Sequence, residues 1–240
     1  YKNRAVTPEE LVAKAKKAGL DGIAVTDHNT GVWIDRLKKA SDRTEMTVFP
    51  GVEITVAGGE KNIHVLAVFD PSKSTEDIHD LLAQLNITAD KRGRTDVLAD
   101  GDVNQVIAAI WKLGGIALLA HCDSTSGVTA EIKGQARINI IRNPRLLGAQ
   151  ITKEETARYF HGGDPDYQRK LACFHGSDSH EIQQLGTSFS QFKLGAMSVN
   201  ALRQCFYDPD TRIRLNAAAE AIYPAILEMK VTGGFLDNVD

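Results

Sequence analysis

The sequence predicts an α/β fold with a parallel sheet, closed into a barrel. Three stretches, residues 7–28, 103–121 and 154–180, each combine a helical segment with a short apolar strand that ends on polar residues. Helices and buried strands in alternation are typical of parallel α/β proteins. Polar residues at successive strand ends favour a barrel, because the carboxyl ends of barrel strands meet at one mouth.

The first stretch begins with a strong helix start. Thr7 is placed to cap the helix, Pro8 occupies its first turn, and Gly19 terminates it. Residues 22–26, "GIAVT", are small and β-branched and predict a strand covered on both faces, which ends at the Asp-His pair 27–28.

The middle of the chain predicts a hairpin and a helix. Residues 47–56 and 62–69 read as strands flanking the turn 57–61, and residues 75–85 read as a helix.

The second and third stretches repeat the first. A helical pattern over 103–115 leads into the strand "IALLAH" at 116–121, which ends on a histidine. A helical segment at 154–160 precedes the strand within "RKLACFHGSDSH", 169–180, which runs into Asp178 and His180.

Composition sets broad limits. The chain has 240 residues, of which 42% are hydrophobic and 25% charged, as in an ordinary soluble protein. A net charge of −3 creates no basic field, so a polyanionic substrate would need local lysines and arginines or metal ions. Three scattered cysteines predict a reducing cytoplasm, and we find no signal peptide or membrane span.

The polar strand ends and the hairpin form a candidate metal-ligand set. Four imidazoles and two carboxylates suit Zn, Mn or Fe better than Ca or Mg alone. The six candidate ligands are His28, Glu53, His64, His121, Asp178 and His180.

Six ligands exceed the need of one tetrahedral ion, so we predict a multinuclear site with Glu53 as its bridging carboxylate. Such a site would activate water and stabilise a departing oxygen, which leads to hydrolysis of a phosphoester as the chemical hypothesis. Glu53, His121 and Asp178 are the predicted catalytic residues, and Asp27 is placed to support a neighbouring ligand by a hydrogen bond.

Each histidine alone is more often structural than ligating, and only the joint occurrence of the motifs favours a site. His79 is predicted to lie on the surface of its helix, and His161 and His175 to be structural or close to substrate. Cys122 follows His121 directly and should point to the opposite face, so it is not expected to bind metal.

The motifs "TDHN", "GVEI", "IHVL", "LLAH" and "SDSH" resemble those of the PHP family, the polymerase and histidinol phosphatase family of metal-dependent phosphoesterases. The resemblance implies a distorted (β/α)7 barrel with up to three metal ions. It assigns Glu53 and Asp178 to one ion, Glu53 with His64 and His121 to a second, and His28 with His180 to a third.

The family usually opens with a strand that carries "HxH", and this sequence starts at Tyr1, just downstream of where that strand would lie. Loss of that strand would remove two ligands from the first ion and one from the third. The other ligands are intact, which favours a truncated chain over a degenerate one.

More narrowly, "GGIALLAHCDS" and "MKVTGGFLD" resemble PHP domains fused ahead of an ABC or SMC-like ATPase. We therefore expect a phosphoesterase domain over 1–215, and a linker and first ATPase strand over 216–240. No Walker A motif is present, so ATP would act only through a downstream domain. The fusion implies nucleic-acid processing, with a role in phage defence.

For substrate binding, Lys91, Arg92 and Arg94 form the densest basic group, with Lys61 a weaker candidate. Solvated loop charges are the commoner meaning of such runs. A nuclease is the first hypothesis. The alternatives are a small-molecule phosphatase, an amidohydrolase-like enzyme, for which no bridging lysine is evident, and an inactive scaffold that regulates an ATPase. Homo-oligomerisation stays open.

Overall fold

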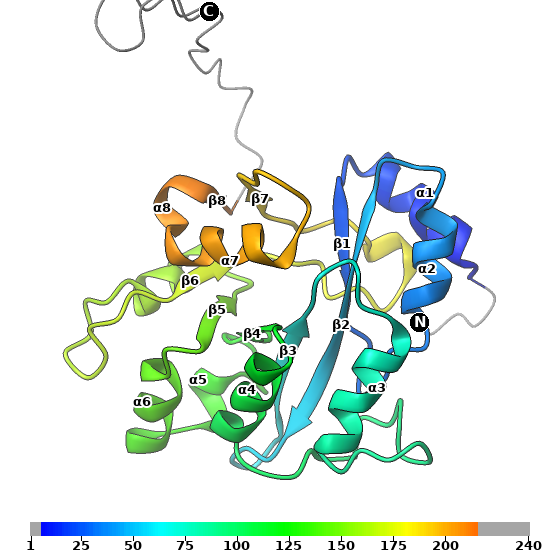
Figure 1. The fold of residues 1–240 in the computed structure, drawn as a ribbon. Coiled ribbons are helices and arrows are strands. Elements are labelled where there is room, and N and C mark those ends of the chain that lie inside the picture. The colour runs from blue at the N-terminus through cyan, green and yellow to red at the C-terminus, as the bar shows by residue number, and fades with distance from the viewer. Residues whose placement is uncertain (1–5, 216–240) are drawn as a thin grey trace, which may run out of the picture.

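The structure, a computed structural model, describes residues 6–215 of the chain. The predicted linker and ATPase strand at 216–240 lie outside the described residues. A six-stranded sheet with the order β1-β2-β3-β4-β5-β6 forms the centre, and β7 and β8 pair separately (Figure 1). The strands are β1 (Gly22–Val25), β2 (Thr47–Val56), β3 (Ile63–Val68), β4 (Ile116–Leu119), β5 (Leu146–Gln150), β6 (Ala172–Phe174), β7 (Gln191–Phe192) and β8 (Ile213–Arg214).

Helices connect and cover these strands. They are α1 (Pro8–Lys17), α2 (Ile34–Ser41), α3 (Thr75–Gln84), α4 (Val103–Lys112), α5 (Val128–Glu131), α6 (Gly134–Arg142), α7 (Val199–Tyr207) and α8 (Pro209–Arg212), with 3₁₀ helices η1 (Glu154–Phe160) and η2 (Ile182–Gln184). The α/β class is therefore confirmed.

The sheet is mixed, which corrects the expectation of a parallel one. Strand β3 runs antiparallel to both β2 and β4, whereas the pairs β1–β2, β4–β5 and β5–β6 are parallel. The turn between β2 and β3 makes the predicted hairpin. Two helices, α3 and α4, join β3 to β4, and the chain re-enters the sheet at the end where β3 leaves it, so that Ile116 pairs with Val68.

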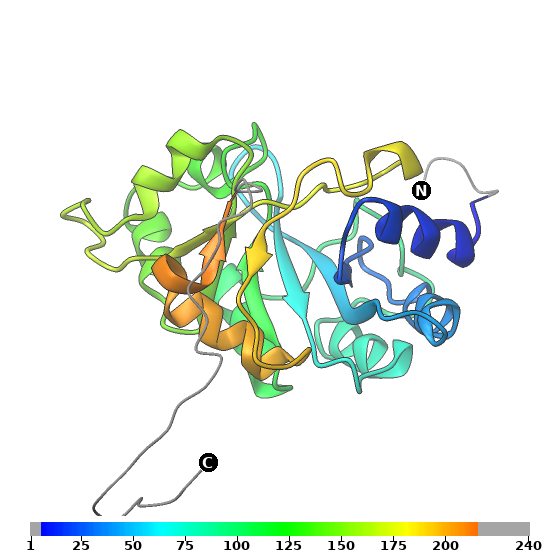
Figure 2. The same ribbon diagram turned by 90° about the horizontal axis from the view of Figure 1, so that it is seen from above.

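The sheet curls into a half-barrel with different cover on its two faces (Figure 2). Alternation along β2 sends Val52 and Ile54 to the outer side, where α3 and α4 pack. Phe49 belongs to a second cluster on the inner side, together with Leu118 of β4 and Phe206 of α7. The edge of β1 opposite β2 has no strand partner within residues 6–215.

Several local expectations are confirmed. The side chain of Thr7 accepts a hydrogen bond from the backbone N–H of Glu10, and the Glu10 carboxylate accepts one from the backbone of Thr7. The segment 154–160 is helical but of the 3₁₀ type. In the described part of the chain, no helix has the length and apolarity needed to cross a membrane.

The placement of His79 on the surface is wrong. The residue is 9% exposed, and its Nε2 accepts a 3.5 Å hydrogen bond from the backbone N–H of Gly31. Helix α3 turns this side chain toward the loop after β1, a contact across 48 residues that helical periodicity alone does not reveal.

Candidate metal centre

Strand pairing brings Glu53 and His64 together on the inner face of the sheet. In the β2–β3 register, Thr55 pairs with His64 and Glu53 pairs with Leu66. Residues two apart on a strand share a face, so Glu53 and His64 are diagonal neighbours. His64 Nδ1 lies 2.7 Å from Glu53 Oε1.

The chain after β1 carries His28 to the same level of the sheet. An isolated parallel bridge joins His28 and Glu53. The backbone N–H of Glu53 donates to the carbonyl of Asp27 at 3.2 Å, and the N–H of Asn29 donates to the carbonyl of Glu53 at 2.9 Å. His28 Nε2 is held 3.8 Å from Glu53 Oε2 as a result.

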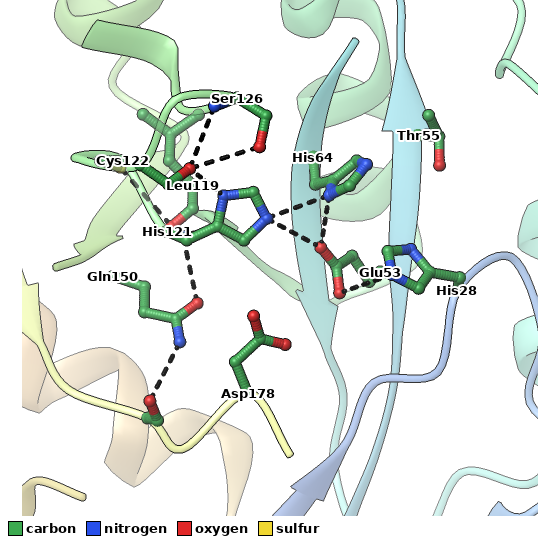
Figure 3. Close-up of polar contacts among 12 residues, drawn as sticks. His28, Glu53, Thr55, His64, Leu119, His121, Cys122, Ser126, Gln150 and Asp178 are labelled. Atoms are coloured by element: carbon green, nitrogen blue, oxygen red, sulfur yellow. Dashed lines mark hydrogen bonds and ion pairs between the residues drawn. The ribbon is translucent and has the colours of Figure 1, made fainter. Parts of the chain in front are cut away.

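His121 reaches the cluster from the end of β4. Its Nε2 lies 3.4 Å from Glu53 Oε1 and 3.1 Å from His64 Nδ1. Figure 3 shows Glu53 between His64 and His121 on one side and His28 on the other. One carboxylate thus faces three imidazoles from three separate strand ends.

Asp178 and His180 stand at the more open side of the cluster, in the loop after β6. Their side chains are 43% and 51% exposed. The His28 and His180 rings are 6.2 Å apart between centroids, and Asp178 lies beside Glu53 and His121 in Figure 3. All six sequence-predicted ligands therefore gather at one place, although β2 and β3 contribute from within the hairpin.

The charged side chains of the cluster shift one another's pKa values. Burial alone would raise the pKa of Glu53, but hydrogen bonds from His121 and His64 outweigh it and lower the pKa to about 2. Burial would lower the pKa of His121, yet the Glu53 carboxylate raises it. Burial lowers the pKa of His28, which favours the neutral imidazole that a metal ion requires.

The donor set fits a divalent cation. One ligand atom each from His28, Glu53 and His64 can be chosen so that all three lie within 4.8 Å of one another. The Nε2 of His121 and the Nδ1 of His64 point at each other and at one carboxylate oxygen, an arrangement that needs a shared cation, a proton or a metal ion. Nitrogen and carboxylate ligands match the preferences of Zn and of related transition metals.

A cavity of about 790 Å³ opens beside the cluster. His28, Glu53, Asp178 and His180 lie in its wall, together with apolar side chains of the inner sheet face and with polar side chains of the surrounding loops. A small ligand can therefore reach Glu53, His28 and His180 through this cavity.

The basic segment after α3 comes close to the site, but its two arginines bond to residues outside the site. Gly93 lines the cavity, and its N–H donates to the carbonyl of Asn29. Arg92 donates to the carbonyl of His79 at 3.3 Å, and Arg94 pairs with Asp96 at 2.7 Å. Lys91 lies in the same turn, half-buried.

The remaining predicted residues lie around the site or away from it. Asp27 meets Glu53 through its backbone carbonyl, and burial raises the pKa of its carboxyl. His175 lines the cavity, whereas His161 lies on the far side of β6, beside Lys170. Cys122 is fully buried as a free thiol.

The hairpin turn at Lys61 is fixed by Glu131, which accepts from the Lys61 backbone N–H.

Three polar residues escaped the sequence interpretation. Ser124 Oγ lies 3.0 Å from His121 Nδ1 and orients that ring. Asn29 is fully buried, and its amide donates to the carbonyls of Arg94 and Val97. Gln150 links the loops after β4 and β6. The sequence signals for Asn29 and Gln150 were their positions as polar residues at the ends of the segments "DHN", 27–29, and "GAQ", 148–150.

Comparison with solved structures gives similar folds at low identity. A protein of Bifidobacterium adolescentis, provisionally assigned as a metal-dependent phosphoesterase, aligns with a TM-score of 0.55 and 20% identity over 83% of this chain and 90% of its own. An amidohydrolase from Chromobacterium violaceum, with bound sulfate and no metal, aligns with a TM-score of 0.56 and 15% identity over 88% and 93%.

The lesion-specific endonuclease Q of Pyrococcus furiosus aligns with a TM-score of 0.65 and 13% identity over 86% of this chain. Our chain spans only 52% of that protein, and 54% of an endonuclease Q bound to a 27-mer duplex with an abasic lesion at its active site. No curated protein matched the sequence. The PHP domain profile matches residues 3–142, more than half of the chain. This protein therefore belongs to the PHP domain family.

Proposed function

We propose that this protein is a metal-dependent phosphoesterase that hydrolyses phosphodiester bonds in nucleic acid. The observation that carries the proposal is the Glu53 carboxylate, which faces His28, His64 and His121 at the wall of an open cavity. The family and the phosphoesterase and endonuclease neighbours support the same class of reaction.

Each residue has a distinct part in this proposal. Glu53 would bridge two ions, with His64 and His121 completing one of them and Asp178 contributing to the other. His28 and His180 lie close enough to share a third. Divalent ions bound there would polarise the phosphoryl group and make a water molecule a better nucleophile. Asp178, half-exposed, can accept a proton from a substrate or a water in the cavity.

Nucleic acid is the favoured substrate for two reasons. The endonuclease Q structure with a duplex shares the fold of this chain, and Gly93 and Thr95, which follow Lys91 closely in the chain, line the cavity. Because the net charge is −3, phosphates would be held by the ions and by local cations such as Lys91. Mn, Zn and Fe are all suited to the ligand set.

The test measures hydrolysis and metal content together. Full-length protein is loaded with Mn²⁺ or Zn²⁺ and assayed on end-labelled single- and double-stranded DNA, on bis(p-nitrophenyl) phosphate and on p-nitrophenyl phosphate. Glu53→Ala and His121→Ala should abolish both activity and bound metal. Thr55→Val is a matched control, since the buried Thr55 hydroxyl makes no hydrogen bond within the described structure.

The outcomes separate the alternatives. Cleavage of the monoester alone would favour a small-molecule phosphatase. Metal binding without any phosphoester cleavage would favour C–N bond hydrolysis, which the amidohydrolase neighbour makes the second candidate. No metal binding in the wild type would refute the proposal and favour an inactive scaffold.

The wider architecture is also proposed. We infer a distorted (β/α)7 barrel over residues 1–215 as the phosphoesterase domain, followed by the start of an ATPase domain at 216–240. In this arrangement the ATPase would control access of nucleic acid to the barrel.

A further inference from the structure

A single buried amide joins two of the loops that carry candidate ligands. Gln150, the last residue of β5, is 6% exposed. Its Oε1 accepts a 3.2 Å hydrogen bond from the backbone N–H of His121, and its Nε2 donates to the carbonyl of Gly176 at 3.3 Å. Figure 3 shows this bridge, with Asp178 next to it.

Both loops hold a ligand residue in an unusual backbone conformation. His121 has φ of 25° and Asp178 has φ of 43°, in or near the left-handed region that residues other than glycine rarely adopt. Such conformations persist only when the surrounding structure fixes them. The bond from Gln150 acts on the backbone of His121 itself and, on the other side, two residues before Asp178.

Further contacts hold Gln150 in place on both sides of the bridge. The backbone carbonyl of Gln150 accepts a 2.8 Å hydrogen bond from Cys122, so the strand end is tied to the same loop twice. On the other side, a Cβ at position 176 would lie 3.2 Å from Gln150 Nε2, so glycine there allows the close approach. A side chain that both accepts and donates is required, and glutamine meets this requirement without adding charge.

We propose that Gln150 is a positioning residue that couples the metal ligands His121 and Asp178. Because one of its bonds holds each loop, loss of the whole side chain would disturb the sites of both ions that these ligands would serve. This inference rests on the proposed metal-dependent function and adds to it the residue that sets the spacing between the ligand loops.

The test uses two substitutions that break different parts of the bridge. Gln150→Met preserves the length of the side chain and removes both bonds, so binding of both ions should weaken by about 10- to 100-fold, as is typical when outer partners of metal ligands are lost. Gln150→Glu keeps an oxygen for the His121 N–H but cannot donate to Gly176. It should weaken one binding step and leave the other within threefold of wild type.

Binding of Zn²⁺ to full-length protein is followed by calorimetric titration and by metal analysis after dialysis, with thermal unfolding in EDTA as the check on folding. Gln135→Met, the same substitution on the exposed face of α6, is the matched control and should bind as wild type does. If Gln150→Met fails to fold, Gln150→Glu alone decides the question.

Wild-type affinity and stoichiometry in a folded Gln150→Met or Gln150→Glu variant would overturn the inference. Glu53→Ala distinguishes a failure of the Gln150 inference from a failure of the proposed function. If it abolishes metal binding while the Gln150 variants bind normally, only the role of Gln150 is refuted. If wild type itself binds no metal, the proposed function fails first.

Discussion

Replacing Glu53 by glutamine removes one negative charge from the midst of the histidines and changes the size of the side chain very little. Glutamine resembles the protonated carboxyl, so the variant reports what the ionised form contributes. Glu53 is 4% exposed and accepts from His64 and His121, which hold its charge in place. The metal-free wild type should therefore be more stable than the variant.

The magnitude follows from the pKa. The folded state lowers the pKa of Glu53 from 4.5 to about 2. Each pKa unit corresponds to about 1.4 kcal/mol, so ionised Glu53 contributes on the order of 3 kcal/mol. Because the folded pKa is depressed, this contribution is complete above the unfolded pKa of 4.5 and is lost as the pH falls toward 2.

Urea unfolding of wild type and Glu53→Gln in EDTA checks the prediction. The difference in unfolding free energy should be about 3 kcal/mol at pH 6 and fall to about 1 kcal/mol at pH 3. A difference that is the same at both pH values would show that the charge of Glu53 does not stabilise the cluster. Equal stability at pH 6 would refute the reasoning altogether.

Three further substitutions test the surroundings of the site. Ser124→Ala frees Nδ1 of His121 and should weaken metal affinity about 10- to 100-fold, measured by calorimetric titration, while thermal unfolding in EDTA stays unchanged. Asn29→Ala leaves several buried backbone groups without partners and should cost about 3 kcal/mol or more in urea unfolding; a loss below about 1 kcal/mol would contradict its role. Gly51→Ala would place a Cβ 2.5 Å from the carbonyl oxygen of Ala67 and should lower the melting temperature markedly, as differential scanning calorimetry would show.

Local signals carried most of the fold prediction. The capped start at Thr7 and the apolar run of β4 depend on neighbours in sequence, and both are confirmed. The direction of β3 against β4 was not foreseen, because it depends on two helices that intervene between them. Strand β5 also escaped notice, although Asn143 and Pro144, a pair typical of turns, stand just before "LLGAQ".

The candidate ligands could be recognised because each stands at a strand or strand end with a characteristic neighbour. The residues that support these ligands could not be recognised from the sequence. Gln150 acts on Gly176 across 26 residues, and Asn29 acts on Val97 across 68. His79 was misplaced for the same reason. Side chains of these types are common in loops and helices, and only the packed structure shows which of them meet.

The most direct measurement of the central claim is a zinc anomalous difference map from crystals of the full-length protein grown with Zn²⁺. We expect strong peaks within about 2.0–2.2 Å of the Glu53 carboxylate and of ring nitrogens of His64 and His121. A well-ordered cluster without a peak between these side chains, or zinc bound only elsewhere, would contradict the account.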